Sequence, residues 1–257
     1  FFGSGKSFRH ARERDLIREG ENHSQISIAY VDAVRENKMS VRFFRDMSKE
    51  MFKNGIKIGR TSNFIGNFRA VLFCPEHLAI VKNDPSERRA FHDHAISQID
   101  RSYLSALMEH KRLLEQRNAL LKSENETKES FWMTLDILSE RLAVCAAAIT
   151  KIRAEYLKRL FDHACVLVQQ MTEGREKIDV RYLSHIAGDA IEDLFDRKGN
   201  EERYRRLMYE NRKREVLAGT TIAGAHREGS AQKSEDGAAI IGTTAARTPV
   251  MPAMTVV

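Results

Sequence analysis

The sequence is poor in cysteine and has no apolar run long enough to cross a bilayer. Its three cysteines, Cys74, Cys145 and Cys165, are odd in number and lack a C-x-x-C spacing, so neither a disulfide framework nor a zinc cage is indicated. No apolar stretch approaches the roughly 20 residues that a membrane-spanning helix needs. These absences favour a protein of the reducing cytoplasm without a membrane partner. The chain also begins without methionine or a signal peptide, and we expect its true start to lie upstream.

The composition is that of a globular chain with a mild basic excess. Apolar residues make up 42% of the 257 residues, enough for the core of one large or two modest domains. Lysine and arginine outnumber aspartate and glutamate by 42 to 36, which gives a net charge of +6. This excess is compatible with a polyanionic partner. With 30% charged residues, however, most charges are expected simply to solvate the surface.

The amino-terminal residues 3–7, G-S-G-K-S, match part of a P-loop pattern. The full pattern G-x-x-x-x-G-K-[ST] places its first glycine five residues before Gly5, where this chain has no residue. Two interpretations remain. Either the loop is a truncated phosphate loop, in which Lys6 and Ser7 bind nucleotide, or it is an unrelated loop and the true P-loop lies upstream. The missing glycine and the charged residues after Ser7 favour the unrelated loop.

Short runs in the first part of the chain predict an antiparallel sheet. The runs are residues 26–31, 40–44, 56–58 and 69–74. Asn54-Gly55 is a strong tight-turn signal between two of them. The last run has the apolar, β-branched character of a buried strand, and Pro75 ends it because proline cannot donate to a ladder. We therefore expect three or four antiparallel strands within residues 1–74.

A helix is predicted to begin at Pro85. Asp84 precedes it as a candidate N-cap, and Glu87 stands at the capping-box spacing. The His-Asp-His run at 92–94 follows, but side chains two residues apart on a helix point to different faces, so no metal site is expected. No Ser/His/Asp or Cys/His set has supporting motif context, and no catalytic residue is assigned.

From residue 100 the apolar periodicity becomes that of paired helices. Two seams with intervals of three and four consist of Leu104, Leu107, Lys111, Leu114, Asn118 and Leu121, and of Leu135, Leu138, Leu142, Cys145, Ile149, Ile152 and Tyr156. The second seam continues less regularly through Leu160, His163, Leu167 and Met171. The polar residues 123–127 between them predict an antiparallel helical hairpin. Asn118 either fixes its register or lies at its edge, and Trp132 is expected to pack near its tip.

After the hairpin, residues 178–183 return to a period of two and are expected to form a strand. Residues 186–217 are expected to be helical, and they hold the densest basic cluster of the chain. Its members are Arg203, Arg205, Arg206, Arg212, Lys213 and Arg214. This cluster is a candidate for contact with DNA phosphates. Glutamates interleaved at i,i+4 spacing favour the alternative of a salt-bridged, solvated face.

Several motifs in the chain match one family pattern in order. They are F-C-P-E-H-L at 73–78, R-R-A-F-H-D at 88–93, Q-R-N at 116–118 and G-A-H-R-E at 224–228. The chain resembles the RecF family of bacterial DNA replication and repair proteins. The matched residues are Pro75, Glu76, Lys82, Pro85, Arg88, Arg89, Phe91, Asp93, Gln116, Arg117, Asn118, His226 and Arg227. Departures such as Cys74, His77, Ala225 and Glu228 leave the arginine pair and the Gln-Arg-Asn run intact.

The resemblance implies a mixed α/β fold, with a small antiparallel sheet from an ABC-type ATPase lobe and a helical-hairpin lobe. It implies four segments: a strand-rich part of lobe I (1–74), a helical arm with a returning strand near 177–184 (75–217), a strand re-entering lobe I (218–229) and a disordered or aberrant tail (230–257). The complete family protein binds ATP and magnesium. It also binds single-stranded or gapped DNA, forms a homodimer and works with recombination-mediator proteins in recombinase loading and the SOS response.

The family's nucleotide-contact motifs are missing from this chain. Beyond Gly229 neither the signature motif nor the Walker B acidic pair follows. We therefore expect this chain to lack ATPase activity and to hold no cofactor. The alternative hypothesis is a non-enzymatic module in which the helical hairpin binds DNA or a protein.

Overall fold

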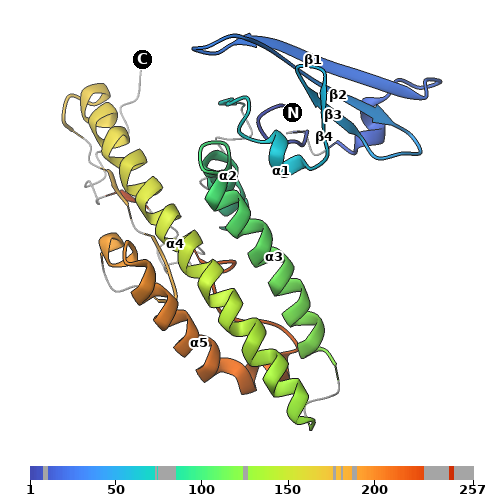
Figure 1. The fold of residues 1–257 in the computed structure, drawn as a ribbon. Coiled ribbons are helices and arrows are strands. Elements are labelled where there is room, and N and C mark those ends of the chain that lie inside the picture. Colours follow the sequence, from blue (N-terminus) through green and yellow to red (C-terminus); the bar gives the residue numbers. More distant parts are fainter. Residues whose placement is uncertain are drawn as a thin grey trace, which may run out of the picture. The chain divides into compact units, whose positions relative to one another are not determined.

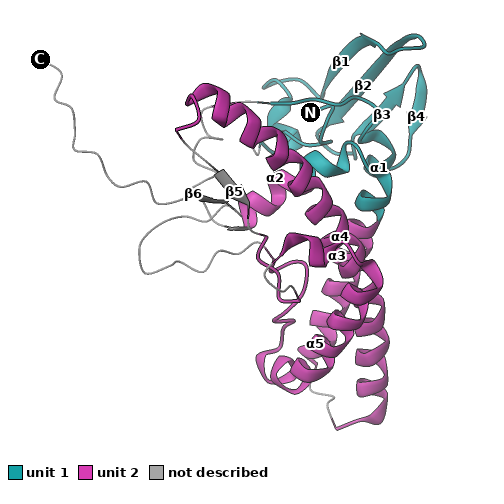
Figure 2. Ribbon diagram, turned by 90° about the vertical axis from the view of Figure 1, so that its left-hand side faces the viewer, with its two compact units in different colours: residues 1–73, 94–105 teal, residues 74–93, 106–257 magenta. Residues whose placement is uncertain are grey.

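The structure is a computed structural model that describes residues 1–7, 11–72, 74, 85–123, 127–175, 178–180, 182–186, 190–228 and 243–245. Contacts divide the chain into two compact units, shown in Figure 2: unit 1 holds residues 1–73 and 94–105, and unit 2 holds residues 74–93 and 106–257. The division passes within helices α2 (Pro85–Ser97) and α3 (Arg101–Leu121). The first break lies one residue from the expected boundary after residue 74, and residues 94–105 belong to unit 1 as well.

Unit 1 is built on a four-stranded antiparallel sheet in the order β1-β2-β3-β4 (Figure 1). The strands are β1 (His23–Val31), β2 (Glu36–Phe44), β3 (Glu50–Lys53) and β4 (Ile56–Ile58). Burial alternates strictly along β2, where Met39, Val41 and Phe43 are fully buried. They form the core of unit 1 with residues such as Ile17 and Phe64. One face of the sheet is therefore packed and the other faces outward.

Two short helices and a tight turn accompany the sheet in unit 1. The 3-10 helix η1 covers Glu13–Leu16 and the single-turn helix α1 covers Thr61–Phe64. The expected turn at Asn54-Gly55 joins β3 to β4, and both of its residues have positive φ, 52° and 82°. This is the backbone that an Asn-Gly hairpin turn requires.

The expected strand at 69–74 is wrong for its described residues. Residues 69–72 and 74 have no strand partner, and Val71 is fully exposed. The side chain of Gln98 replaces a neighbouring strand: its oxygen accepts from the Ala70 N–H at 2.8 Å, and its amide donates to the Ala70 carbonyl at 3.2 Å. Because one side chain satisfies both backbone groups, no ladder is needed there.

Unit 2 contains the predicted helical hairpin. Helix α3 leads into the long helix α4 (Glu129–Met171), and helix α5 (Arg197–Ala218) runs alongside α4 (Figure 1). Arg141 of α4 donates to Glu109 of α3 at 2.7 Å, and Arg205 of α5 donates to Glu140 of α4 at 2.6 Å. Trp132 packs beside the buried Phe131, as expected for a packing residue. The sheet and the hairpin together confirm the predicted mixed α/β fold class.

Two ends of the predicted seam on α3 are confirmed, because Leu104 and Leu121 are buried. Between them the buried face lies one residue away from the prediction: His110, Leu113 and Arg117 are buried, whereas Lys111 is exposed. The predicted seam held Lys111 and Asn118, whereas the structure buries His110 and Arg117, whose side chains meet groups of other elements. The side chain of Arg117 is fully buried.

Helix α4 has two buried faces rather than one. Leu135, Leu142 and Ile149 follow the predicted heptad spacing. A second face of small residues, Ala143, Ala146, Ala147, Thr150 and Ala154, is also buried, because α5 packs on α4 as well. The predicted extension of the seam is wrong beyond Leu157: Leu160, Leu167 and Met171 are exposed, the last to 82%.

The remaining described elements are short. They are β5 (Ile178–Val180), the 3-10 helix η3 (Ile191–Leu194) and β6 (Thr243–Ala245), which pairs antiparallel with β5. Strand β5 lies within the expected 177–184, and β6 lies in a stretch where a disordered tail was expected. None of the described residues 218–228 lies in the strand expected at 218–229: residue 218 ends α5, and residues 219–228 are turns, bends and irregular backbone. Among the described helices, none has the length and apolarity to cross a membrane, and no disulfide links the three cysteines.

Candidate functional site

Several family-motif residues of unit 2 contact residues 219–228, here called the return segment. The segment begins at Gly219, whose φ of 63° caps the end of α5 in the left-handed region. Gly224 has a φ of 137°, and a Cβ there would lie 3.2 Å from Nδ1 of His226. Both positions favour glycine, and together they fold the segment back against the helices.

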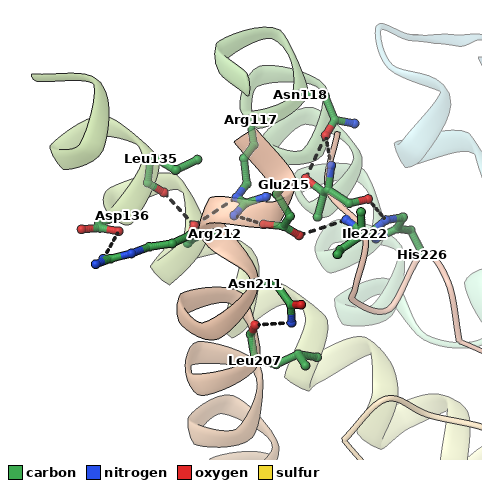
Figure 3. Close-up of polar contacts among 12 residues, drawn as sticks. Arg117, Asn118, Leu135, Asp136, Leu207, Asn211, Arg212, Glu215, Ile222 and His226 are labelled. Atoms are coloured by element: carbon green, nitrogen blue, oxygen red, sulfur yellow. Dashed lines mark hydrogen bonds and ion pairs between the residues drawn. The ribbon is translucent and has the colours of Figure 1, made fainter. Parts of the chain in front are cut away.

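A buried ion pair anchors the start of the return segment. Arg117 of α3 donates through one terminal nitrogen to the Glu215 carboxylate at 2.6 Å, and both side chains are completely buried. The other nitrogens of Arg117 donate to the Thr221 hydroxyl at 2.8 Å and the Ser139 hydroxyl at 3.0 Å. Figure 3 shows Arg117 and Glu215 pointing toward each other between α3 and α5. The pair thus joins three helices and the return segment.

Asn118 binds the same segment. Its side-chain oxygen accepts from both the Thr221 N–H and the Thr221 hydroxyl, each at 2.8 Å (Figure 3). Glu215 accepts in addition from the Ile222 N–H at 2.9 Å. The side chain of Asn118 therefore binds both the backbone and the side chain of Thr221 in the return segment.

A second ion pair holds the middle of the return segment. Both carboxylate oxygens of Asp93 accept from Arg153, at 2.9 and 3.0 Å, and the third nitrogen of Arg153 donates to the Ala225 carbonyl at 2.8 Å. The fork geometry of arginine suits this bidentate contact. Asp93 and Arg153 therefore serve the attachment of α2 and the return segment to α4.

At the end of the return segment, the carboxylate of Glu228 is surrounded by hydroxyl groups. Glu228 is 1% exposed and accepts from the hydroxyls of Thr150, Tyr182, Ser184 and Tyr204. Burial and the adjacent negative charge of Glu228 raise the pKa of Tyr182. Arg89 of α2 donates to the Glu228 backbone carbonyl at 3.2 Å. A buried carboxylate with several donors is compatible with stability.

Two histidines lie beside this network. His110 is 4% exposed, and its ring centroid lies 5.9 Å from that of His226. Burial lowers the pKa of His110 to about 3 and that of His226 to about 4. Both rings line a cavity of about 390 Å³ among α2, α3, α4 and the return segment. The described residues hold no group of three or more histidine, cysteine or acidic side chains placed for a metal ion.

The remaining family-motif residues all belong to unit 2. Pro75, Glu76 and Lys82 lie outside the described residues, and Pro85 is the first residue of α2. Arg88 is buried, Phe91 is 40% exposed and Arg227 is exposed. Gln116 is exposed and accepts from Arg112 at 3.2 Å. The sequence analysis did not identify three residues of this network, Arg153, Glu215 and Thr221. A single polar residue in an apolar pattern does not indicate which distant residue it will contact.

The loop with Lys6 and Ser7 is held by its own backbone and by Lys49. The Ser4 hydroxyl accepts from the Lys6 N–H at 3.2 Å, and Lys49 donates to the Gly5 carbonyl at 3.2 Å. In the described chain, the next helix is the short η1 at Glu13–Leu16. A phosphate loop instead directs its N–H groups at the ligand from the start of a helix.

The basic cluster of α5 is partly engaged in ion pairs. Arg205 pairs with Glu140 and Glu201, each at 2.6 Å, and Arg212 lies 3.9 Å from Asp136 and over the Tyr209 ring. Arg203 donates to Asn200, and Arg214 to Asn211. Arg206, Lys213 and Arg214 are exposed.

The chain is similar in sequence to known DNA replication and repair proteins. No family model matches the chain. It is 32% identical over 224 residues to the DNA replication and repair protein RecF of Shouchella clausii, and 30% identical over 228 residues to that of Clostridium perfringens. These matches cover 87% and 89% of this chain, and 59% and 60% of the relatives. The chain thus spans about 60% of the length of the curated relatives.

Solved structures of RecF resemble the chain in fold as well. The chain superposes with a TM-score of 0.81 and 27% identity on the recombination mediator protein RecF-ATPrS in the RecFOR pathway, and with 0.80 on the RecF-ATP form. Each match covers 88% of this chain and 60% of the solved one. The fold is therefore that of the ATPase-like, hairpin-bearing class of DNA repair proteins. The chain is thus similar to about 60% of the length of RecF-family proteins.

Proposed function

We propose that this chain acts in DNA replication and repair by binding single-stranded or gapped DNA. In the complete protein this activity would be joined to ATP and magnesium binding, homodimerisation, recombination-mediator partners, recombinase loading and the SOS response. The observation that carries the proposal is the shared RecF fold together with the convergence of its motif residues on the return segment. We infer a cytoplasmic location from the same family.

The motif residues support a scaffold role rather than a direct DNA contact. Arg117, Asn118 and Asp93 are engaged by protein groups, and Arg117 is completely buried. Phosphate contacts need accessible lysine and arginine side chains. The DNA surface is therefore to be sought on exposed cations.

The outward face of the sheet in unit 1 offers such cations. Lys38, Arg42 and Lys57 are exposed on β2 and β4. Lys57 also pairs with Glu50 at 2.6 Å, and Arg42 donates to Gln25 at 2.8 Å, but exposed contacts of this kind are weak. The guanidinium of Arg42 lies over the Phe52 ring, 5.2 Å from its centroid. Basic side chains beside an aromatic ring suit a single strand, whose phosphates bind the cations and whose bases stack. We propose this face as the DNA contact, with the exposed Arg206, Lys213 and Arg214 of α5 as the competing candidates.

The test compares two triple variants that remove the same charge. Fluorescence anisotropy with labelled gapped DNA would measure the affinities of Lys38→Gln/Arg42→Gln/Lys57→Gln and of Arg206→Gln/Lys213→Gln/Arg214→Gln. We expect the sheet variant to lose about tenfold or more in affinity and the α5 variant less than about threefold. The reverse order would assign DNA binding to α5. Equal small losses, with circular dichroism showing both variants folded, would reject the proposal and leave the hairpin as a protein-binding module.

Calorimetry with Mg-ATP tests the amino-terminal loop separately. We expect no heat of binding from this chain, because the Gly5 carbonyl faces Lys49 and no helix of more than one turn follows in the nearby described residues. Binding that is present in the wild type and absent in Lys6→Ala would instead show that residues 3–7 form a phosphate loop.

A further inference from the structure

The outward face of the sheet in unit 1 carries two phenylalanine side chains, Phe44 at the end of β2 and Phe52 on β3. Burial alternates along β2, and Phe44 shares the face of the exposed Arg42, not that of the buried core residues. Phe52 is paired across the ladder with the exposed Lys57 of β4. Both phenylalanines are partly exposed, and neither belongs to the core cluster of unit 1. Their rings are therefore available at the surface of the sheet.

A second flat group lies against each of these rings. His23 of β1 is directly opposite Phe44 in the ladder, and the two rings stack with 6.4 Å between their centroids and 30° between their planes. The guanidinium of Arg42 lies 5.2 Å from the centroid of the Phe52 ring. Both His23 and Arg42 are exposed. Nucleic acid bases stack on aromatic rings and on arginine guanidinium planes, so each pair offers a surface that suits a base.

The ladder register sets the spacing of the two pairs. Phe52 is opposite Ser40, and Phe44 lies four residues beyond Ser40 on β2. At ~3.4 Å per residue, this separation is about 14 Å along the strand. The bases of a duplex follow each other every ~3.4 Å and stack on one another, so their faces are not free for other rings. The bases of a single strand can unstack and turn toward the protein. The two pairs therefore suit an extended single strand.

The charge of unit 1 also favours a nucleic acid. Lysine and arginine outnumber aspartate and glutamate there by 15 to 9, so unit 1 carries +6, which equals the net charge of the whole chain. On the outward face itself, Lys38, Arg42 and Lys57 stand against Glu36 and Glu50. Glu50 pairs with Lys57 at 2.6 Å. The positive excess of the face is therefore small, and the rings must supply much of its selectivity.

We propose that the His23/Phe44 pair and the Arg42/Phe52 pair are two base-stacking sites, through which this face selects single-stranded over double-stranded DNA. The inference rests on the DNA contact proposed above for the same face, and it adds which part of the DNA is bound, the unpaired bases. Every base has a flat face, so the two sites accept any sequence. Lys57, the ladder partner of Phe52, supplies a phosphate contact beside the second site.

The first test changes the DNA and leaves the protein as it is. Fluorescence anisotropy compares three labelled probes of equal length at the same salt: oligothymidine, an abasic single strand and a blunt duplex. The abasic strand keeps every phosphate and loses every base. We expect the abasic strand and the duplex each to bind at least about tenfold more weakly than oligothymidine. Equal binding of the abasic strand or of the duplex would overturn base stacking and leave the phosphate contact standing. No binding of any probe at low salt would overturn both proposals.

The second test removes the rings. The variant Phe44→Leu/Phe52→Leu keeps apolar side chains, and we expect it to lose about tenfold or more in affinity for oligothymidine. Its affinity for the abasic strand and its salt dependence should not change, because every cation remains. Phe161→Leu removes a partly exposed ring from α4 of unit 2 and should bind as the wild type does. Wild-type affinity for oligothymidine in the double variant, shown to be folded by circular dichroism, would overturn the assignment of the rings. If the double variant does not fold, the abasic strand decides.

Discussion

Arg117 is the residue at which unit 2 concentrates its buried polar contacts. Its guanidinium meets Glu215, Thr221 and Ser139 inside the protein, with no exposure of its own side chain. Taking two charges out of water is costly unless their remaining hydrogen-bonding groups are satisfied. Here Glu215 also accepts from the Ile222 N–H, so both partners are satisfied. Loss of either partner would leave an uncompensated buried charge.

Arg117→Ala should therefore destabilise the protein by about 3–5 kcal/mol, measured by urea unfolding followed by circular dichroism. Arg112→Ala serves as the control, because Arg112 forms an exposed pair with Glu109 at 2.6 Å and its loss should cost at most about 1 kcal/mol. Similar stabilities of the two variants would mean that the buried pair does not hold the return segment.

The buried histidines predict a loss of stability in acid. Burial lowers the pKa of His92 and of His226 to about 4, and that of His110 to about 3. Below about pH 6.5 the unfolded chain binds protons that the folded chain does not bind until these lower values. The free energy of unfolding is therefore unaffected by these rings above about pH 6.5, and it decreases as the pH falls from there toward 4.

His110→Phe should make the free energy of unfolding less dependent on pH. Between about pH 6.5 and pH 4.5 the slope should fall by up to about 1.4 kcal/mol per pH unit, because one proton fewer is bound on unfolding. Urea unfolding across this range measures the slope, and the exposed His163→Phe should keep that of the wild type. An unchanged slope in His110→Phe would show that the ring is protonated in the folded protein.

Among the elements, the end of α2 depends on Gln98 for its connection to residues 69–72. The amide of this buried side chain replaces a strand partner for Ala70. Gln98→Leu keeps the bulk and removes both hydrogen bonds, so we expect a loss of about 1–3 kcal/mol and faster hydrogen exchange at the Ala70 amide. Gln25→Leu, at an exposed site on β1, should leave this exchange rate unchanged. A protected Ala70 amide in Gln98→Leu would refute this role.

The sequence predicted those helices, strands and turns that depend on residues close together in the chain. The Asn-Gly turn, the start of α2 at Pro85 and the helical hairpin follow from neighbouring residues. The seam of α3 was placed one residue away between residues 110 and 117, because the partners that bury His110 and Arg117 lie far along the chain. The second buried face of α4 was not predicted. Its alanines are small and only weakly apolar, and their burial depends on the packing of α5, which the sequence does not reveal.

At the scale of the whole molecule, the candidate site joins residues that are far apart in sequence. Arg117 and Glu215 are separated by 98 positions, and Asp93 and Arg153 by 60. Family motifs indicated Arg117, Asn118, Asp93 and His226, but not their partners. Spacing cannot predict such pairs, because they depend on how the return segment packs against three helices.

The salt dependence of DNA binding tests the proposed function most directly. Anisotropy titrations of a labelled single strand at increasing salt should give a linear fall of log affinity with log salt, with a slope of about −2 for three phosphate contacts. The variant Lys38→Gln/Arg42→Gln/Lys57→Gln should lose most of this slope while remaining folded. No binding at low salt, or a slope that the variant leaves unchanged, would contradict DNA binding through the sheet of unit 1.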